Sequence, residues 1–258
     1  MLDMEKDILF GSLGPEHNPT CRFAMFNRYG GQSQPPFSYL NCSYAVGDDR
    51  EAVAANRSRM KDALKLDRLV SVGQVHGDGI YCLEEFPADD LEEDGYDAIV
   101  SLLPEVGLMI QHADCQAVLL CDPGRRIIAA VHSGWRGSVG DILGKTVRLM
   151  SDRYAARPQD IMAVIGPSLG PCCSEFINHR LELPEQFQRF RTVDNHFDFW
   201  QISREQLTTA GLLSPSISVA GPCTSCSPDY FSYRRARKTG NGVTGRNGSV
   251  IVLGKSTI

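Results

Sequence analysis

Three short segments carry the side chains best suited to chemistry, and each holds one strong metal ligand. They are Gln74-Val75-His76-Gly77, Ala113-Asp114-Cys115 and Val131-His132-Ser133-Gly134-Trp135-Arg136-Gly137. Imidazole and thiolate are natural ligands of zinc. Three protein ligands leave the fourth tetrahedral position of zinc open for water or substrate, which is typical of a catalytic site. If His76, Cys115 and His132 meet, they predict a catalytic metal centre.

Spacing by itself leaves other interpretations open. The separations between the three residues match no short zinc signature. A loop histidine is more often hydrogen-bonded than metal-bound, and a single cysteine is more often a small buried hydrophobe. A metal-free hydrolase with Cys115 as nucleophile and a histidine as base, acting for example on cell-wall peptides, uses the same residue types.

Arginines in glycine-rich turns suggest a second role, anion binding. Arg28 stands next to a Gly-Gly pair, and Arg136 lies between two glycines. A guanidinium recognises phosphate or carboxylate with paired donors. Arg235 and Arg246 are similar candidates near the C-terminal end of the chain. Taken singly, each of these arginines is better explained by a surface ion pair.

The nine cysteines are odd in number, which argues for reduced thiols rather than a disulfide framework. Cys223 and Cys226 form a C-x-x-C pair that fits a redox centre or half of a structural zinc site. No second C-x-x-C completes that site, and the adjacent Cys172 and Cys173 are poorly placed to chelate one ion together. A packing role is therefore favoured for these four. The remaining histidines, His17, His112, His179 and His196, are expected to be structural or exposed.

The candidate ligands stand at the ends of expected strands, where rigid elements deliver their side chains to a common place. Apolar runs bounded by turn residues predict strands at 69–75, 80–83, 108–112, 117–121, 127–132, 161–165, 217–220 and 249–253. Helical periodicity predicts helices over 49–66, from Val139 to Met150, and over most of 180–215. The acidic segment 84–97 is interpreted as a surface loop. This mixture predicts an α/β or α+β fold.

Composition excludes several classes of protein. The chain has 258 residues, 42% hydrophobic and 22% charged, and its net charge of -5 is spread along the sequence. Nucleic-acid binding is not expected, since the only basic cluster is Arg234-Arg235-Ala236-Arg237-Lys238, interpreted as a solvated loop or an anion-binding segment. No apolar run is long enough to span a bilayer, and the first residues do not resemble a signal peptide. We expect a cytoplasmic protein without membrane contacts.

Taken together, the motifs resemble the laccase-domain family, also called the YfiH family, multicopper polyphenol oxidase-like proteins and purine nucleoside phosphorylases. The three ligand segments match its central motifs in order. Its other motifs are matched by Arg28-Tyr29-Gly30-Gly31, Leu40-Asn41, Val46-Gly47-Asp48-Asp49, Asn56-Arg57, Gly166-Pro167-Ser168-Leu169-Gly170-Pro171-Cys172-Cys173, Cys223-Thr224, Phe231-Ser232-Tyr233-Arg234-Arg235 and Thr244-Gly245-Arg246. The match runs from about residue 22 to residue 253.

The resemblance implies a single domain over residues 1–258 with α-β-β-α layers, similar to the cytotoxic necrotizing factor deamidases. It implies that His76, Cys115 and His132 bind Zn²⁺ and form the catalytic centre. It also implies phosphorolysis of purine nucleosides such as adenosine, inosine and methylthioadenosine, and deamination of adenosine. The expected partners are therefore small purine nucleosides and phosphate.

A working mechanism assigns further residues. Arg28 and Arg136, with Arg235 in addition, are expected to hold phosphate, and Gln74 and Asn41 to contact the nucleoside through their amides. Asp114 is a candidate for orienting a metal ligand, although a hydrogen bond at the end of a strand explains it equally well.

This sequence departs from the family pattern at Ala117, where proline is frequent, at Ser133, where alanine is frequent, and at His112, where a small or hydroxyl residue is common. None of these changes removes a ligand, but His112 could compete for the metal. Copper-dependent oxidation of phenols is a weaker alternative, because multicopper chemistry needs several histidine clusters and the chain has six scattered histidines. A binding module with a purely structural zinc is the non-enzymatic alternative.

Overall fold

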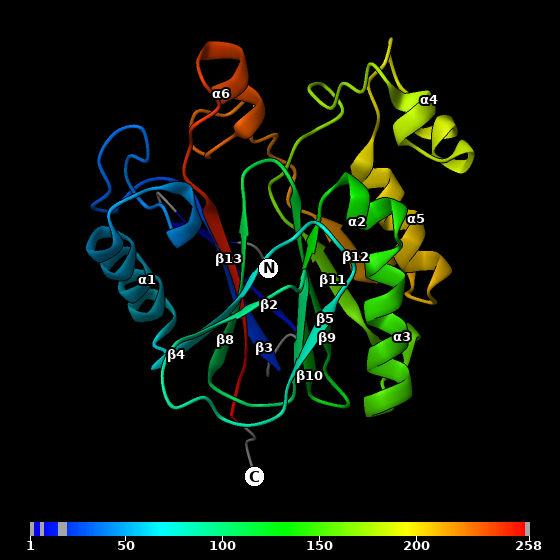
Figure 1. Cartoon of the computed structure of the whole chain (residues 1–258). Coiled ribbons are helices and arrows are strands. Elements are labelled where there is room, and N and C mark those ends of the chain that lie inside the picture. Colours follow the sequence, from blue (N-terminus) through cyan, green and yellow to red (C-terminus); the bar gives the residue numbers. More distant parts are fainter. Residues whose placement is uncertain (1–2, 6–7, 15–19, 256–258) are drawn as a thin grey trace.

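The computed structural model describes residues 3–5, 8–14 and 20–255, in which two β-sheets face each other and helices cover their outer surfaces (Figure 1). The first sheet has seven strands in the order β1-β2-β3-β13-β8-β4-β6, and the second has six in the order β12-β11-β9-β10-β7-β5. The predicted α/β class with α-β-β-α layers is confirmed.

The elements follow one another closely, apart from irregular segments at 27–43, 166–178 and 220–232. The strands are β1 (Asp3–Glu5), β2 (Ile8–Leu13), β3 (Cys21–Phe26), β4 (Arg68–Gly73), β5 (Ile80–Leu83), β6 (Leu91–Asp94), β7 (Ala98–Ser101), β8 (Val106–His112), β9 (Gln116–Asp122), β10 (Ile127–Ser133), β11 (Met162–Ile165), β12 (Ile217–Val219) and β13 (Asn247–Leu253). The α-helices are α1 (Arg50–Leu64), α2 (Trp135–Val139), α3 (Ile142–Tyr154), α4 (His179–Glu182), α5 (Phe199–Thr209) and α6 (Tyr233–Thr239). Short 3₁₀ turns are η1 (Tyr44–Val46), η2 (Pro158–Asp160), η3 (Glu185–Phe190) and η4 (Ser214–Ser216).

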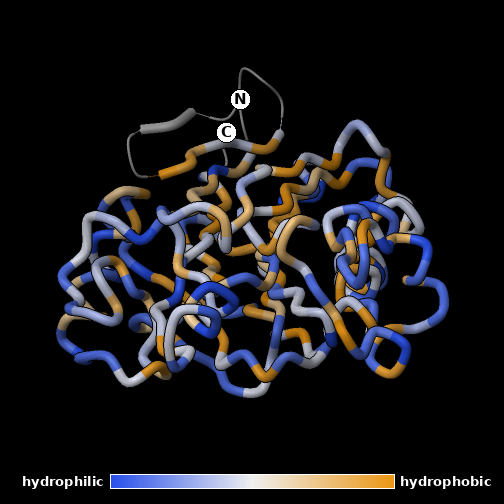
Figure 2. Tube along the Cα trace, turned by 90° about the horizontal axis from the view of Figure 1, so that it is seen from above, coloured by the Kyte–Doolittle hydropathy of each residue, from blue (hydrophilic) through white to orange (hydrophobic). Residues whose placement is uncertain are grey.

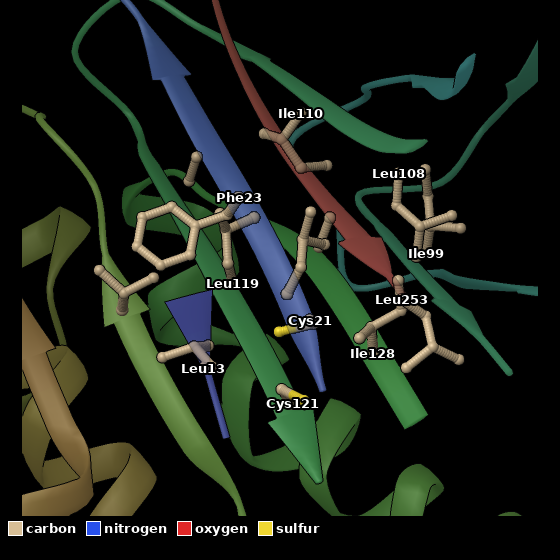
Figure 3. Close-up of a cluster of buried hydrophobic side chains, with 14 of the residues drawn as sticks. Leu13, Cys21, Phe23, Ile99, Leu108, Ile110, Leu119, Cys121, Ile128 and Leu253 are labelled. Atoms are coloured by element: carbon tan, nitrogen blue, oxygen red, sulfur yellow. The ribbon is translucent and has the colours of Figure 1, made fainter. Parts of the chain in front are cut away.

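The main core lies between the two sheets. Phe23 and Ile110 from the first sheet pack with Leu119 and Ile128 from the second (Figure 3). Every residue of β8, β9, β10 and β13 is buried. These strands are covered on one face by the opposite sheet and on the other by the outer helices, which explains why they read as continuous apolar runs rather than alternating ones.

Helices close the two outer faces. Met60 and Leu64 of α1 pack on the first sheet, and Leu143 and Val147 of α3 pack on the second. The N-cap of α1 is Asp49, whose carboxylate accepts a hydrogen bond from the Ala52 N–H at 2.9 Å. In Figure 2 much of the hydrophobic chain lies inside the outline, and the outer loops are mostly hydrophilic.

Most predicted elements are present within a few residues of their expected limits, but three interpretations were wrong. The acidic segment 84–97 is not only a surface loop, since it contains β6 and ends at a fully buried Asp97. The region 180–215 contains only short helices and α5, with an irregular stretch at 191–198. The basic cluster 234–238 lies in a helix, α6, and not in a loop. None of the helices among the described residues has the length and apolar character needed to cross a bilayer.

Candidate metal centre and substrate cavity

The three predicted ligands meet. One donor atom from each of His76, Cys115 and His132 lies within 4.8 Å of the other two. The two imidazole rings are 4.8 Å apart at their centroids and perpendicular to each other. Among the described residues, no fourth His, Cys, Asp or Glu joins this group. The donor set therefore fits a tetrahedral ion with one position left for a reactant.

Strand register explains why residues so far apart in sequence converge. In the second sheet, β9 and β10 are antiparallel, with Gln116 opposite Ser133. Just beyond this pair, Cys115 precedes β9 and Gly134 follows β10. Cys115 therefore lies beside the end of β10 that carries His132. His76 comes from the other sheet, three residues after β4. The centre thus lies where the two sheets open at one end.

Asp97 orients His132 and was not predicted. Its Oδ1 lies 2.7 Å from His132 Nδ1, and its side chain is fully buried. This hydrogen bond leaves Nε2 of His132 free to face Cys115 and a metal, which is the arrangement that fixes the tautomer of a metal-bound histidine. Asp97 precedes β7, and Ala98 pairs with Val131 of β10, so the register brings Asp97 beside His132.

The same carboxylate also positions His76. It accepts hydrogen bonds from the backbone N–H groups of Val75 at 3.3 Å, His76 at 3.0 Å and Gly77 at 2.7 Å. His76 has a φ of 60°, a left-handed conformation that is uncommon for a residue with a side chain. Three N–H groups directed at one buried carboxylate hold that conformation in place. One residue therefore organises two of the three ligands.

Electrostatics at the centre favour a charged thiolate. Burial raises the pKa of Cys115, but the positive charge of His132 and hydrogen bonds from both imidazoles lower it more, so the net shift is downward. Burial lowers the pKa of His132, but the Cys115 thiolate and the hydrogen bond to Asp97 raise it overall. These opposite shifts in pKa favour a thiolate at Cys115 beside a protonated His132. Because the thiolate is the form that binds metal, the lowered pKa of Cys115 favours the binding of a metal ion.

Gly134 leaves room for the ligands to approach one another. A Cβ atom at this position would lie 3.1 Å from Cys115 Sγ and 3.2 Å from His76 Cδ2. The φ of Gly134 is -77°, so its backbone does not require glycine. The absence of a side chain here is therefore a matter of space at the centre.

The three ligands line a cavity of about 850 Å³, a size suited to a nucleoside and an anion. Its wall carries four guanidinium groups and several aromatic rings. The arginines are Arg136, Arg234, Arg237 and Arg246, and the aromatic residues are Trp135, Phe176, Phe199 and Tyr233. Arg136 stacks over the Trp135 ring at 4.7 Å. The cavity thus offers cations for an anion and flat apolar surfaces for a planar base.

Two of the five predicted substrate-binding residues, Gln74 and Arg136, line the cavity. Both ends of the Gln74 amide are engaged by the backbone of Gln111: Nε2 donates to its carbonyl at 2.7 Å, and Oε1 accepts from its N–H at 2.9 Å. Gln74 therefore joins β4 to β8 beneath the cavity. Arg136 is exposed, and its guanidinium makes no hydrogen bond to any of the described residues.

The other three predicted residues, Arg28, Asn41 and Arg235, are engaged elsewhere and are not part of the cavity wall. Arg28 donates to the Ser38 carbonyl through Nε at 2.8 Å and Nη2 at 2.6 Å. Asn41 is fully buried and accepts from the Arg246 N–H at 2.9 Å. Arg235 donates to carbonyl groups of the loop 224–230. These contacts stabilise the loops around the cavity.

Asp114 and His112 have structural surroundings. The Asp114 carboxylate accepts from the Thr224 hydroxyl at 2.7 Å and the Arg234 N–H at 2.5 Å, so the carboxylate that orients a ligand is Asp97 and not Asp114. His112 is buried, and its Nε2 lies 2.9 Å from Ser249 Oγ. Burial, together with nearby His132 and Arg246, lowers the pKa of His112 to about 3, so its imidazole is neutral. His17 lies outside the described residues.

Comparison with known proteins agrees with this geometry. Residues 22–254 match the family model described as multi-copper polyphenol oxidoreductase laccase. The chain belongs to this family. It is 33% identical over 238 residues to the purine nucleoside phosphorylase YlmD of Geobacillus stearothermophilus, covering 85% of each chain. It is 32% identical to the purine nucleoside phosphorylase YfiH of Shigella flexneri, covering 83% of this chain and 88% of the relative.

A solved structure of the family has the same fold. The crystal structure of YlmD from Geobacillus stearothermophilus superposes with a TM-score of 0.86 at 30% identity, covering 98% of this chain and 99% of that one. The resemblance inferred from the motifs is therefore confirmed, and it extends over nearly the whole length of both chains.

Proposed function

We propose that this protein is a zinc-dependent purine nucleoside phosphorylase. The observation that carries the proposal is a three-ligand centre of His76, Cys115 and His132 that opens into a cavity with both guanidinium groups and aromatic rings. Relatives that cover most of the chain bear the name purine nucleoside phosphorylase, which supports the same activity here. Adenosine, inosine and methylthioadenosine are the proposed substrates.

In phosphorolysis, an oxygen of phosphate forms a bond to the anomeric carbon of the ribose while the bond from that carbon to the purine nitrogen breaks. The purine leaves with the electron pair and takes up a proton, and ribose-1-phosphate is the other product. A zinc ion at the three ligands would supply Lewis acidity to an oxygen of the reactants. The protein must bind phosphate on one side of the ribose and the base on the other.

Arg246 and Arg136 are the proposed phosphate ligands, in place of Arg28 and Arg235. Arg246 lines the cavity, and burial lowers its pKa, although the nearby Cys115, Cys42 and Asp114 oppose this shift. Its Nη1 is fixed by the carbonyl groups of Thr244 and Gly245 at 3.0 and 3.1 Å. A half-buried guanidinium held in this way offers its remaining donors to an anion without losing much side-chain entropy. Arg136 is more exposed and can approach phosphate from the cavity mouth.

Zinc is favoured over copper by the chemistry of the site. Two imidazoles and one thiolate form a single mononuclear centre, and the only other candidate group in the described part of the chain consists of four cysteines. Multicopper oxidation requires several histidine-rich centres that pass electrons to oxygen. Metal analysis of the purified protein, combined with electron paramagnetic resonance for Cu²⁺, tests this choice.

A metal-free cysteine hydrolase is the second candidate, and one observation favours it. Cys115, His132 and Asp97 have the relative order of a nucleophile, a base and a carboxylate that orients the base. His76 argues for the metal, since a hydrolase has no need of a second imidazole at the thiolate. Activity that resists chelators and is abolished by thiol alkylation would support the hydrolase.

The deciding experiment incubates the purified protein with adenosine or inosine, with and without phosphate, and separates the products by chromatography. Free base and ribose-1-phosphate that appear only with phosphate support the proposal, and inosine formed from adenosine would show the predicted deamination. His76→Ala and Cys115→Ala should abolish turnover. Arg246→Met should raise the KM for phosphate at least tenfold, with Arg28→Met as the matched control outside the cavity. Absence of any product at every metal loading would refute the enzyme assignment.

A further inference from the structure

Four cysteines outside the proposed active site gather into a second cluster. Cys172, Cys173, Cys223 and Cys226 have sulfur atoms that all lie within 4.8 Å of one another. Cys226 Sγ is 3.5 Å from both Cys172 Sγ and Cys173 Sγ. All four are free thiols. The structure assigns to these residues a tetrathiolate metal site, with Zn²⁺ as the ion that fits the donor set.

The distances suit a tetrahedral ion better than they suit a thiol cluster. With Zn–S bonds of about 2.3 Å, tetrahedral geometry separates each pair of sulfur atoms by about 3.8 Å. Two pairs here, both involving Cys226, are slightly shorter than this at 3.5 Å, and all other pairs lie within 4.8 Å, so small rotations of the side chains would complete the tetrahedron. Adjacent cysteines are poorly placed to share an ion on sequence grounds, but the turn at 171–173 directs both Cys172 and Cys173 towards Cys226.

Packing does not account for the cluster. Cys172 and Cys226 are exposed, and Cys173 and Cys223 are only partly buried. A thiol contributes to packing when it replaces a small apolar side chain in a core, as Cys21 and Cys121 do between the sheets (Figure 3). Four thiols brought together at a surface have no such role, whereas thiolates bound to a metal do not require burial.

The two loops that carry the four cysteines are joined by strand pairing and by backbone hydrogen bonds. One follows β11 and the other follows β12, and these strands are parallel neighbours, with Ile165 paired with Val219. The pairing continues beyond the strands, because the Ser168 N–H donates to the Pro222 carbonyl at 3.2 Å and the Thr224 N–H to the Ser168 carbonyl at 3.0 Å. The site is therefore positioned by the second sheet and not by chance proximity of two surface loops.

The backbone and one nearby guanidinium contact the loop that holds the sulfur atoms. The Gly170 N–H donates to Cys223 Sγ at 3.3 Å, and a Cβ on Gly170 would lie only 3.1 Å from Cys223 Cβ. Four thiolates and one Zn²⁺ carry a net charge of -2. The guanidinium of Arg235 is fixed inside the same loop by the carbonyl groups of Thr224 and Ser227 at 2.7 and 2.9 Å, so a half-buried cation lies in the loop that carries Cys223 and Cys226.

The proposed ion would secure one wall of the substrate cavity. Thr224, next to Cys223, donates its hydroxyl hydrogen to Asp114, the residue that precedes Cys115. On the other loop, Ser174 and Glu175 follow Cys173 directly and line the cavity. Metal binding displaces one proton from each thiol to solvent and links residues 54 positions apart. The role is structural, because four protein ligands leave no position for a reactant.

Metal content of the full-length protein, prepared under reducing conditions and loaded with Zn²⁺, tests the assignment independently of any enzymatic activity. We expect two zinc ions per chain in the wild type, and one in both Cys226→Ser and Cys115→Ala. The matched control is Cys82→Ser, a partly buried thiol outside both clusters, which should retain two. Equal zinc contents in the wild type and Cys226→Ser would overturn the proposal, whereas a single zinc that is lost in Cys226→Ser and kept in Cys115→Ala would support the cluster and contradict only the centre at His76, Cys115 and His132.

Cobalt substitution keeps the test valid if Cys226→Ser fails to fold. Co²⁺ bound to four thiolates gives sulfur-to-metal charge-transfer absorption that is much stronger than that of a centre with one thiolate, because the intensity grows with the number of Co–S bonds. In Cys115→Ala this spectrum should persist at one equivalent of Co²⁺, with a wild-type circular dichroism spectrum as the check on folding. If Cys115→Ala binds no Co²⁺ in this form, or if its remaining thiols pair as disulfides under the reducing conditions, the cluster is not a metal site.

Discussion

Replacing Asp97 with asparagine tests the claim that one buried carboxylate organises the metal centre. The two side chains have nearly the same shape, but asparagine is neutral and carries only one acceptor oxygen. Asp97 accepts four hydrogen bonds, one from His132 and three from the backbone at residues 75–77. If the amide oxygen remains on His132 and the His76 N–H, the amide NH₂ must face the N–H groups of Val75 and Gly77.

The expected magnitude follows from the Gly77 N–H, which loses its acceptor at a partly buried site; Val75 is exposed, and its N–H can bond to water instead. A buried N–H left without a partner costs about 1–3 kcal/mol, so the free energy of unfolding should fall by about 1–3 kcal/mol. For a chain of this length, such a loss lowers Tm by roughly 2–12 °C. Removal of the negative charge behind His132 should also weaken zinc binding about 10- to 100-fold, since the imidazole loses part of its basicity.

A competitive chelator titration measures zinc affinity, and thermal unfolding of the zinc-free protein measures stability. Asp122→Asn is the matched control, because Asp122 is also fully buried and accepts from the backbone N–H groups of Arg125 and Arg157 at 2.9 and 3.1 Å, far along the strand from the centre. This variant should lose stability and keep its zinc affinity. Wild-type zinc binding in Asp97→Asn, or an equal loss of affinity in Asp122→Asn, would refute the reasoning.

Two further perturbations examine the centre itself. Gly134→Ala should reduce zinc affinity at least tenfold, because the new Cβ would contact Cys115 Sγ and His76 Cδ2 too closely. The change in Tm should be small, because the backbone at this position suits any residue. Unchanged zinc affinity in the chelator titration would contradict this prediction. In the zinc-free protein, the pKa of Cys115 is shifted downward, so its thiolate persists at pH values well below the usual thiol pKa of 9.0. Alkylation of Cys115 by iodoacetamide, measured by mass spectrometry, should therefore continue at neutral pH and decline only in more acidic buffer. Zinc should protect Cys115 from alkylation, and a rate that rises only above pH 8.5 would show an ordinary thiol.

Local patterns in the sequence were sufficient for the strands that surround the centre. The apolar runs of β9, β10 and β13 are continuous because both of their faces are buried, and such runs are recognisable without knowledge of their partners. The motifs that hold His76, Cys115 and His132 indicated candidate ligands because imidazole and thiolate are the donors that zinc prefers, although their spacing alone left other interpretations open. The family resemblance followed from the order of these motifs along the chain.

Sequence patterns failed where the role of a residue depends on a distant neighbour. Asp97 ends a run of acidic residues that looks solvated, and only the pairing of β7 with β10 brings its carboxylate to His132. Arg28 and Arg235 looked like anion ligands, but the loops supply carbonyl groups that engage both guanidinium groups. The four cysteines could not be recognised as one cluster, because their two loops meet only after β11 and β12 have paired. Amino-acid types thus determined which chemistry was available to this protein, while strand register, which is set by contacts remote in sequence, decided which side chains could act together.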